Sequence, residues 1–414
     1  GRGGPDGPGR GGRSRGMPHT AAAPPPGGSG GAAVVLDSGS GWCKAGFAGE
    51  SAPRVDIPAA VGWPRATGAL LGAAQRFAVG ANLHAWGLDS DVRYPIDHGI
   101  VTHWDDVEEI WHHALSHLDA EGQYPVLVTE PPLNPKSNRM QLVNLLFEEF
   151  HVPAVHVAIS GALSLYATGG RTGVVLESGD GTSHAVPVFE DYVVPHAVQR
   201  LDLGGRDLTA YLARLLREER GCRLPGSAGR RAAAEAKERL CYVAERFQAE
   251  LRAAAEDPAL QEQSYSLPDG SIVVTAGSER FRCPEALFQP GLLGREEQGG
   301  VQELLHRAIV GCGVDVQRAL RSNVVLSGGT ALFRGMRERV SRELVGLLPP
   351  TAPVRVSLPP APRHAAFVGG SILASLSDFR RTWISRRDYE ELGAAAIDAK
   401  SMCLTEAGIR GGSR

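Results

Sequence analysis

The sequence of 414 residues predicts an α/β protein built from two related halves. Three observations support this fold class. Short β-branched runs alternate along the chain with segments of helical period. The stretch "VVLDSGSG", which begins at Val34, recurs as "VVLESGDG", which begins at Val174, with six of eight positions identical. The composition, 43% hydrophobic and 21% charged, is typical of a globular chain with a substantial core. The repetition indicates an ancient duplication and predicts a site between the two halves.

Four runs have the composition of buried strands. Each is short, rich in β-branched residues and followed by a turn or an acidic residue, as in the sheet of an α/β protein. These runs cover residues 32–36, 125–130, 172–177 and 323–329.

Three segments between these runs have the apolar spacing of helices. In residues 138–150 the apolar face consists of Val143, Leu146, Phe147 and Phe150. In residues 206–219 it consists of Leu208, Leu212, Leu215 and Leu216. We expect residues 230–253 to form a third helix, with the face Leu240, Val243, Ala244, Phe247 and Leu251. All three faces are interpreted as core packing.

Residues 1–31 differ from the rest of the chain, since they hold twelve Gly, six Pro and four Arg. Such a segment has too little to bury to offset the entropy of ordering, and we expect it to be disordered. Its "GRGG" and "RGGR" pieces are similar to RNA-associated segments, although four arginines make a plain leader the favoured interpretation.

Composition argues against several classes of partner. The net charge of −3 does not favour nucleic acid or an acidic membrane. No apolar run approaches the length of a membrane span, and the N-terminus lacks the apolar core of a secretory signal. The six cysteines form neither CxxC pairs nor a dense framework, so we expect reduced thiols in an intracellular protein.

The repeated turn has the chemistry of a phosphate-binding loop. Glycines permit close approach of the backbone, and successive N–H groups form a concavity that binds anions. Lys44 supplies a cation for phosphates, while Asp37 and Glu177 end their strands where they can orient water around a divalent cation. A third glycine turn lies in residues 324–333 and suits a base or ribose. The inferred ligand is a nucleoside triphosphate with Mg²⁺.

Many ordered stretches of the chain carry a family resemblance. The stretches "LDSGSGWCKAGFAGESAPR", "YPIDHGIVTHWDDVEEIWHH", "LVTEPPLNPKSNR", "VPHAVQRLDLGGRDLTAYL", "KERLCYVAERF", "ERFRCPEALFQP" and "VVLSGGTALFRG" all resemble actin. The similarity extends from about Ala32 to Cys403, with many departures. The chain is thus similar to divergent vertebrate actin-like proteins, with the testis-type group favoured.

The resemblance implies an actin-like, duplicated ribonuclease-H-like fold in which two α/β domains flank a nucleotide cleft. The small domain would be residues 32–166 plus 365–403, the large domain 167–364, and 404–414 a flexible tail. ATP or ADP with Mg²⁺ or Ca²⁺ would be the cofactors, the metal being held through water by Asp37 and Glu177. The implied nucleotide-binding residues are Asp37, Ser40, Gly41, Lys44, Glu177, Gly179, Asp180, Gly181, Gly205, Lys237, Glu238, Gly328, Gly329, Thr330 and Arg363. Among these, Arg363 stands where actin has Lys.

The same resemblance predicts weak or absent ATP hydrolysis. Ser160 stands where actin has the glutamine that positions the attacking water, and its side chain is too short to reach that water. Glu177 stands where actin has Asp, and the extra carbon moves the carboxylate by about 1.5 Å. His184 remains a candidate proton relay, with a turn-capping role as the equal alternative.

The resemblance also predicts poor assembly into filaments. In the apolar plug of actin, matched by residues 289–300, Arg295, Glu296 and Glu297 introduce charges that are unfavourable to bury. The loop matched by residues 62–80 has lost most of its actin-like sequence. The cleft that binds partners of actin keeps Tyr166, Ala167, Ile372, Leu373 and Leu376. Asp191, Asp378 and Thr382 replace Gly, Thr and Met around it, which predicts altered partner choice.

We therefore expect an actin-like cytoskeletal scaffold protein with little or no enzymatic activity. The expected partners are cytoskeletal or actin-binding proteins, including actin, and the expected location is the cytoplasm, with the nucleus as an alternative. A subunit of a nuclear chromatin-remodelling assembly is the second interpretation, disfavoured because the body has no insertions. His113 and His117 are spaced like a metal-binding pair, but packing is favoured because no third ligand lies at a suitable local spacing.

Overall fold

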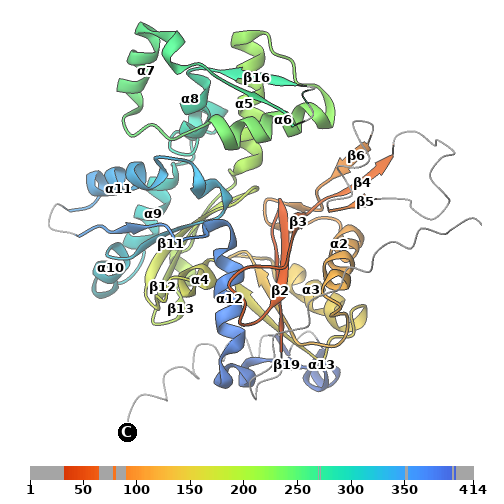
Figure 1. Cartoon of the computed structure of the whole chain (residues 1–414). Helices are drawn as coiled ribbons and strands as arrows, with labels where there is room; N and C mark the ends of the chain where they lie inside the picture. The colour runs from red at the N-terminus through yellow and green to blue at the C-terminus, as the bar shows by residue number, and fades with distance from the viewer. Residues whose placement is uncertain are drawn as a thin grey trace, which may run out of the picture.

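A computed structural model describes residues 32–64, 78–80, 90–268, 270, 272–349, 353–393 and 396–397. The predicted disordered leader, most of the loop at 62–80 and the predicted flexible tail lie outside these residues. Two sheets, each with its own helices, lie side by side (Figure 1).

The first sheet contains the first copy of the repeated stretch. Its strand order is β19-β10-β9-β1-β2-β3. The strands are β1 (Val34–Ser38), β2 (Trp42–Phe47), β3 (Val55–Pro58), β9 (Val126–Glu130), β10 (Ala154–Ile159) and β19 (Ile384–Ser385). The helices of this half are α2 (Trp104–His117), α3 (Lys136–Glu148), α4 (Ser160–Tyr166), α12 (Ala365–Ser375) and α13 (Arg386–Leu392).

The second sheet contains the second copy. Its order is β13-β12-β11-β17-β18, with β14 also paired to β12. The strands are β11 (Gly173–Ser178), β12 (Ser183–Phe189), β13 (Tyr192–Val193), β14 (Gln199–Leu201), β17 (Val324–Ser327) and β18 (Val356–Ser357). Its helices are α5 (Gly205–Arg220), α6 (Gly226–Leu240), α7 (Phe247–Glu256), α8 (Glu279–Glu285), α9 (Val301–Val310), α10 (Val314–Arg321) and α11 (Met336–Leu347).

Further short strands lie outside the two main sheets. They are β4 (Val61–Pro64), β5 (Ala78–Val79), β6 (Ser90–Arg93), β7 (Ile96–Asp97), β8 (Ile100–Val101), β15 (Gln263–Ser266) and β16 (Val273–Ala276). The strands β4 to β6 make a small sheet beside β3, and β15 pairs with β16 near α6. No helix in the described ranges is long and apolar enough to cross a membrane.

The two sheets repeat one topology at their centres. In each, the repeated strand forms an antiparallel hairpin with the next strand, β1 with β2 and β11 with β12. On its other edge each repeated strand pairs in parallel with a later strand, β9 for β1 and β17 for β11. The predicted α/β class with four buried strands is therefore confirmed, and the sequence repetition has a structural counterpart.

Two of the three predicted helices are confirmed, as α3 and α5, and their predicted apolar faces are buried. The third prediction is wrong, because helix α6 ends at Leu240 and α7 begins only at Phe247. Between them the backbone N–H of Tyr242 donates to Arg280 O at 3.1 Å, and that of Val243 to Arg334 O at 2.9 Å. These bonds to distant segments replace helical ones, so tertiary contacts override the local helical period.

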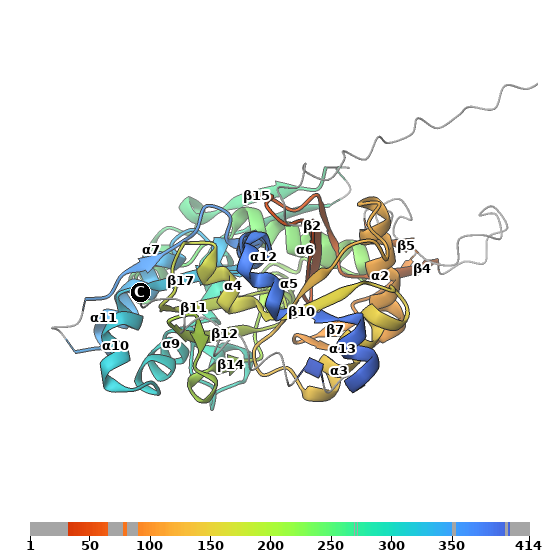
Figure 2. The same ribbon diagram turned by 90° about the horizontal axis from the view of Figure 1, so that it is seen from below.

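Helices α4 and α12 pack against each other in the middle of the molecule (Figure 2). Glycine permits this close approach, since a Cβ on Gly369 of α12 would lie 1.7 Å from Leu163 O of α4. Helix α4 also packs on β11 of the second sheet, and α12 packs on β1 of the first, so the helix pair joins the two sheets.

A buried histidine makes stability depend on pH. His156 on β10 is 3% exposed, and burial lowers its pKa to about 4 although its ring contacts Thr382 O. Above about pH 6.5 the ring is neutral in the folded and the unfolded chain. As the pH falls from 6.5 to 4, the His156 ring takes up a proton in the unfolded chain but not in the folded chain. Protonation therefore favours the unfolded chain, and the free energy of unfolding decreases.

We expect the variant His156→Gln to weaken that acid dependence. Over pH 4.5–6 the slope of the unfolding free energy against pH should decrease by about 1.4 kcal/mol per pH unit. Urea unfolding followed by circular dichroism at several pH values measures this slope. The exposed His196→Gln should leave the slope unchanged, and an unchanged slope for His156→Gln would mean that the ring is protonated in the fold.

Candidate functional site

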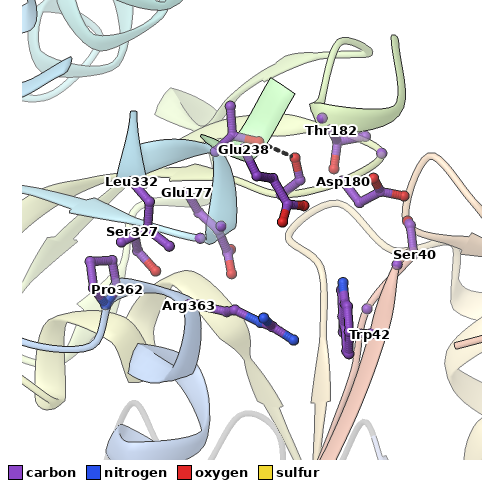
Figure 3. Close-up of a pocket in the computed structure, with 18 of the residues that line it drawn as sticks. Ser40, Trp42, Glu177, Asp180, Thr182, Glu238, Ser327, Leu332, Pro362 and Arg363 are labelled. Carbon is purple, nitrogen blue, oxygen red and sulfur yellow. Dashed lines mark hydrogen bonds between the residues drawn. The ribbon is translucent and has the colours of Figure 1, made fainter. Parts of the chain in front are cut away.

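A cavity of about 610 Å³ lies between the two sheets and is lined by residues of both halves. Its volume is that of a typical site for a drug-sized ligand. Figure 3 shows Trp42 facing Glu177 and Glu238 across this space, with Asp180 beside Ser40. All fifteen residues predicted to bind nucleotide line this one cavity, although they span positions 37 to 363.

The two copies of the repeated stretch form matching hairpins whose turns meet. In the first turn the N–H of Gly39 donates to Trp42 O at 2.9 Å, and in the second that of Gly179 donates to Thr182 O at 2.9 Å. The turns are in direct contact, since a Cβ on Gly41 would lie 2.7 Å from Asp180 Cβ. The turns therefore approach the same cavity from opposite sides, as two loops that share one ligand must.

Asp37 and Lys44 form the charged pair of the first hairpin. They are cross-strand partners, and Lys44 Nζ donates to Asp37 Oδ2 at 2.8 Å. Thr129, at the end of neighbouring β9, donates to Asp37 Oδ1 at 2.9 Å. All three side chains are buried. Thr129 was not predicted, although its position in the parallel neighbour of β1 was a usable signal.

Glu177 and Ser160 are bonded to each other in the second half. Ser160 Oγ donates to Glu177 Oε2 at 2.7 Å. Burial raises the pKa of Glu177 to about 7, with a further increase from the nearby Asp37 charge and partial compensation by Ser160 and Lys44. Asp37 and Glu177 thus repel each other across the cavity, which a bound cation would relieve.

His184 occupies in the second hairpin the place that Lys44 occupies in the first. It is the cross-strand partner of Glu177, as Lys44 is of Asp37. The ring is 2% exposed, and burial together with the Arg200 charge lowers its pKa to about 4. The second hairpin therefore presents a neutral imidazole where the first presents a cation. Its buried Nε2 has no hydrogen-bond partner among the described residues.

Residues of the second half form the part of the cavity away from the first hairpin. Lys237 Nζ donates to Gly205 O at 2.6 Å, and Thr330 Oγ1 donates to Gly179 O at 2.8 Å. Gly328 has a φ of +89°, and a Cβ there would lie 2.1 Å from Ser178 O, so only glycine fits. The predicted third glycine turn therefore packs directly on the second hairpin.

Two further residues of the site carry no signal in the sequence. Arg206, in the first turn of α5, contacts Asp180 at 2.9 Å and donates to Ser40 O at 2.7 Å, so it ties the two turns together. Trp42 lines the cavity, and the Cζ atom of Arg363 lies 3.9 Å from its ring centroid.

The residues predicted for a partner cleft surround the packed helices α4 and α12. Ile372 and Leu376 are exposed, while Tyr166 and Ala167 are half-buried. Leu373 is a correction, because it is 6% exposed and packs in the core rather than on the surface. On α12 the side chain of Leu373 lies about 100° around the helix axis from that of Ile372, so the two neighbours face the core and the solvent respectively.

The carboxylate of Asp191, which interacts with Tyr166, is already paired. Arg171 Nε donates to its Oδ2 at 2.6 Å, and Asp191 has a φ of +71° in the turn after β12. The predicted negative charge is therefore offset, whereas Asp378 is exposed.

The described residues hold no group of three or more His, Cys, Asp or Glu side chains that could bind a metal directly. The rings of His113 and His117 lie 4.2 Å apart, and His117 Nδ1 contacts His113 O at 2.7 Å. Asp37 and Glu177 both line the cavity, one from a strand of each hairpin, an arrangement that suits a cation bound through water.

In a comparison with protein-family models, the chain matches the model for Actin over residues 28–402, a span that contains every residue the structure describes.

Proposed function

Because the chain belongs to the actin family, we propose that it is an actin-like scaffold protein that binds ATP or ADP with a divalent cation in the cleft between its halves. The actin-like fold is that of its family, whose members generally bind a nucleotide with such a cation. The observation that carries the proposal is the pair of hairpins that meet at one cavity, with the fifteen predicted residues around it.

The residues of the cavity suit a nucleoside triphosphate. Glycine turns from both halves offer backbone N–H groups to phosphates, and Lys44 adds a cation. The carboxylates of Asp37 and Glu177 repel each other, which favours a bound cation between phosphate and protein. When bound, Mg²⁺ would neutralise phosphate charge, and the protein would hold its water ligands through these two carboxylates.

Weak hydrolysis is supported by the Ser160–Glu177 hydrogen bond. An attacking water needs a group that orients it near the terminal phosphate. Here the Ser160 hydroxyl donates its proton to Glu177 Oε2 at 2.7 Å, so that proton is not available to an attacking water. The neutral, buried His184 is a poor proton acceptor because its pKa is lowered to about 4. We propose that the protein retains nucleotide without efficient turnover.

Poor self-assembly is supported by the segment that matches the actin plug. Its Arg295 is bound to its own chain, since Nη2 lies 2.7 Å from Asp207 Oδ1 and Nη1 contacts Asp202 O. If the segment moved toward a neighbouring subunit, these bonds would break and unpaired charges would be buried in the interface.

We propose cytoskeletal proteins as partners and the cytoplasm as the location.

The binding proposal predicts that Mg-ATP raises the thermal midpoint of the full chain. A ligand at 100 times its dissociation constant adds about 2.7 kcal/mol to the stability. Lys44→Met should abolish most of this gain, because it removes the phosphate cation and leaves Asp37 without its 2.8 Å partner. Differential scanning fluorimetry with and without Mg-ATP measures both effects.

Lys136→Met on α3, a residue that does not line the cavity, is the matched control and should keep the full nucleotide effect. Absence of any shift for the wild-type chain at millimolar Mg-ATP would refute nucleotide binding. Sedimentation of the same protein with Mg-ATP tests assembly, and pelleting at micromolar concentration would contradict poor self-assembly.

A further inference from the structure

We infer that Asp56 positions Arg363 over Trp42 and that this assembly, the Asp56–Arg363–Trp42 gate, sets the rate at which nucleotide enters and leaves the cavity. The inference rests on the proposed nucleotide binding. It concerns three residues that are brought together from three separate places in the sequence.

The gate is built from one stack and one ion pair. Arg363 Cζ lies 3.9 Å from the Trp42 ring centroid, and Figure 3 shows the Arg363 side chain extended toward the indole. Arg363 Nη2 donates to Asp56 Oδ1 at 3.0 Å. The other oxygen of Asp56 contacts His364 Nε2 at 3.0 Å, so the carboxylate is held on both sides. A guanidinium fixed in this way has little freedom to leave the ring.

The charges of this region alternate across the first sheet. Lys44 on β2 lies opposite both Asp37 on β1 and Asp56 on β3. Lys44 bonds to Asp37, which leaves Asp56 to a different cation, Arg363. Trp42 lies two residues before Lys44 on the same strand and therefore on the same face. The sheet thus presents an acceptor and a ring for one guanidinium at one place.

The gate joins the two halves where the cavity opens. Arg363 lies in the 3₁₀ turn Pro362–His364. This turn is fixed to the second half, because Gly328 N–H donates to Pro362 O at 2.9 Å. Trp42 and Asp56 belong to the sheet of the other half. Trp42 is 36% exposed and the Arg363 side chain 33% exposed, although both line the cavity, so they lie at its rim.

Asp56 itself does not line the cavity. It is therefore a positioning residue that acts through Arg363, which lines the cavity at its rim. A gate that must open before a ligand passes slows association and dissociation by the same factor and leaves the affinity unchanged. A direct ligand contact instead changes the affinity, mainly through dissociation. The two roles are thus separable by kinetics.

The test uses the full chain loaded with a fluorescent ATP analogue and Mg²⁺. Release is followed after a chase with unlabelled ATP, and association by stopped flow. Asp56→Asn keeps the shape of the side chain and removes its charge. We expect both rates to increase about tenfold, with an equilibrium affinity within about a factor of two of wild type. Trp42→Phe, which weakens the stack, is the second variant and should have the same effect on both rates.

Arg387→Met is the control, since it breaks the exposed Arg387–Glu391 pair on α13 and should leave both rates unchanged. If the wild-type chain binds the analogue but Asp56→Asn and Trp42→Phe leave both rates unaltered, the gate is overturned and the proposed function is not. Faster release with weaker affinity would make Arg363 a simple ligand contact and also overturn it. A wild-type chain that binds no analogue would overturn the proposed function, and the gate with it.

Discussion

Changing Ser160 to Gln and Glu177 to Asp together is expected to raise the rate of ATP hydrolysis about 100-fold. These are the residue types that actin has at the two positions. In this chain Ser160 Oγ donates its single proton to Glu177 Oε2 at 2.7 Å, so the hydroxyl has no proton left to donate to an attacking water. The shorter Asp would withdraw its carboxylate from position 160, and the longer Gln would extend an amide into the cavity that both residues line.

Single-turnover phosphate release, with enzyme in excess of radiolabelled ATP, measures this effect. Each single variant should gain less than the double variant. In Glu177→Asp alone the Ser160 hydroxyl is still too short, and in Ser160→Gln alone the long Glu177 carboxylate captures the new amide. Adding Lys44→Met to the double variant should remove the gain by removing the phosphate cation. Hydrolysis by the wild-type chain as fast as by the double variant would contradict the proposal.

The nonadditivity expected here follows from the geometry. Two groups that bond to each other share one interaction, and removing either alone leaves the other in a site built for its partner. The double variant therefore tests the pair as a unit rather than two independent residues.

Strands and site glycines of this protein were predictable because their signals are local. A β-branched run before a glycine turn specifies a buried strand and its end, and β1 and β11 begin and end within two residues of their predicted positions. A Cβ at Gly41 would lie 2.7 Å from Asp180 Cβ, one at Gly181 2.6 Å from Ser40 Oγ, and one at Gly328 2.1 Å from Ser178 O, so glycine is needed at these three positions. Once the duplication was recognised, one cavity between the two hairpins followed from topology.

The prediction of one helix over residues 230–253 was wrong because the deciding contacts are not local. Its apolar spacing is compatible with a helix, but the backbone of Tyr242 and Val243 bonds to Arg280 and Arg334, far along the chain. Asp56 and Arg363 are separated by 307 positions, and Ser160 and Glu177 are joined through one short hydroxyl. Pairings of this kind depend on the assembled tertiary structure, and no window of the sequence contains them.

The second large effect is expected in the core of the second half. Arg339 of α11 is 5% exposed and makes a bidentate pair with Glu285 of α8, at 2.8 and 2.9 Å, while Glu285 is fully buried. Arg339→Met should lower the free energy of unfolding by about 3–5 kcal/mol, because it leaves a buried carboxylate with the Gln289 amide as its remaining side-chain donor. Urea unfolding at pH 7 measures the change.

Two further variants separate the charge from the packing. Arg337→Met, on another face of the same helix, breaks an exposed pair with Glu338 and should change stability by less than about 0.5 kcal/mol. Arg339→Met combined with Glu285→Leu should regain most of the loss, since no unpaired charge then stays buried. A loss below about 1 kcal/mol for Arg339→Met would show that water reaches Glu285.

The same arginine also connects this core to the cavity. Arg339 Nη1 donates to Ala244 O at 2.8 Å, which holds the connection between α6 and α7. Cys241 and Tyr242 of that connection line the cavity. After α6 ends at Leu240, bonds to distant segments hold the connection in place. Losing the bond to Ala244 should therefore make this wall of the cavity less ordered. We therefore expect Arg339→Met to reduce the thermal shift produced by Mg-ATP, whereas Arg337→Met keeps it. The double variant Arg339→Met with Glu285→Leu regains stability but still lacks the bond to Ala244, so a reduced shift in that variant distinguishes loss of the nucleotide site from general destabilisation.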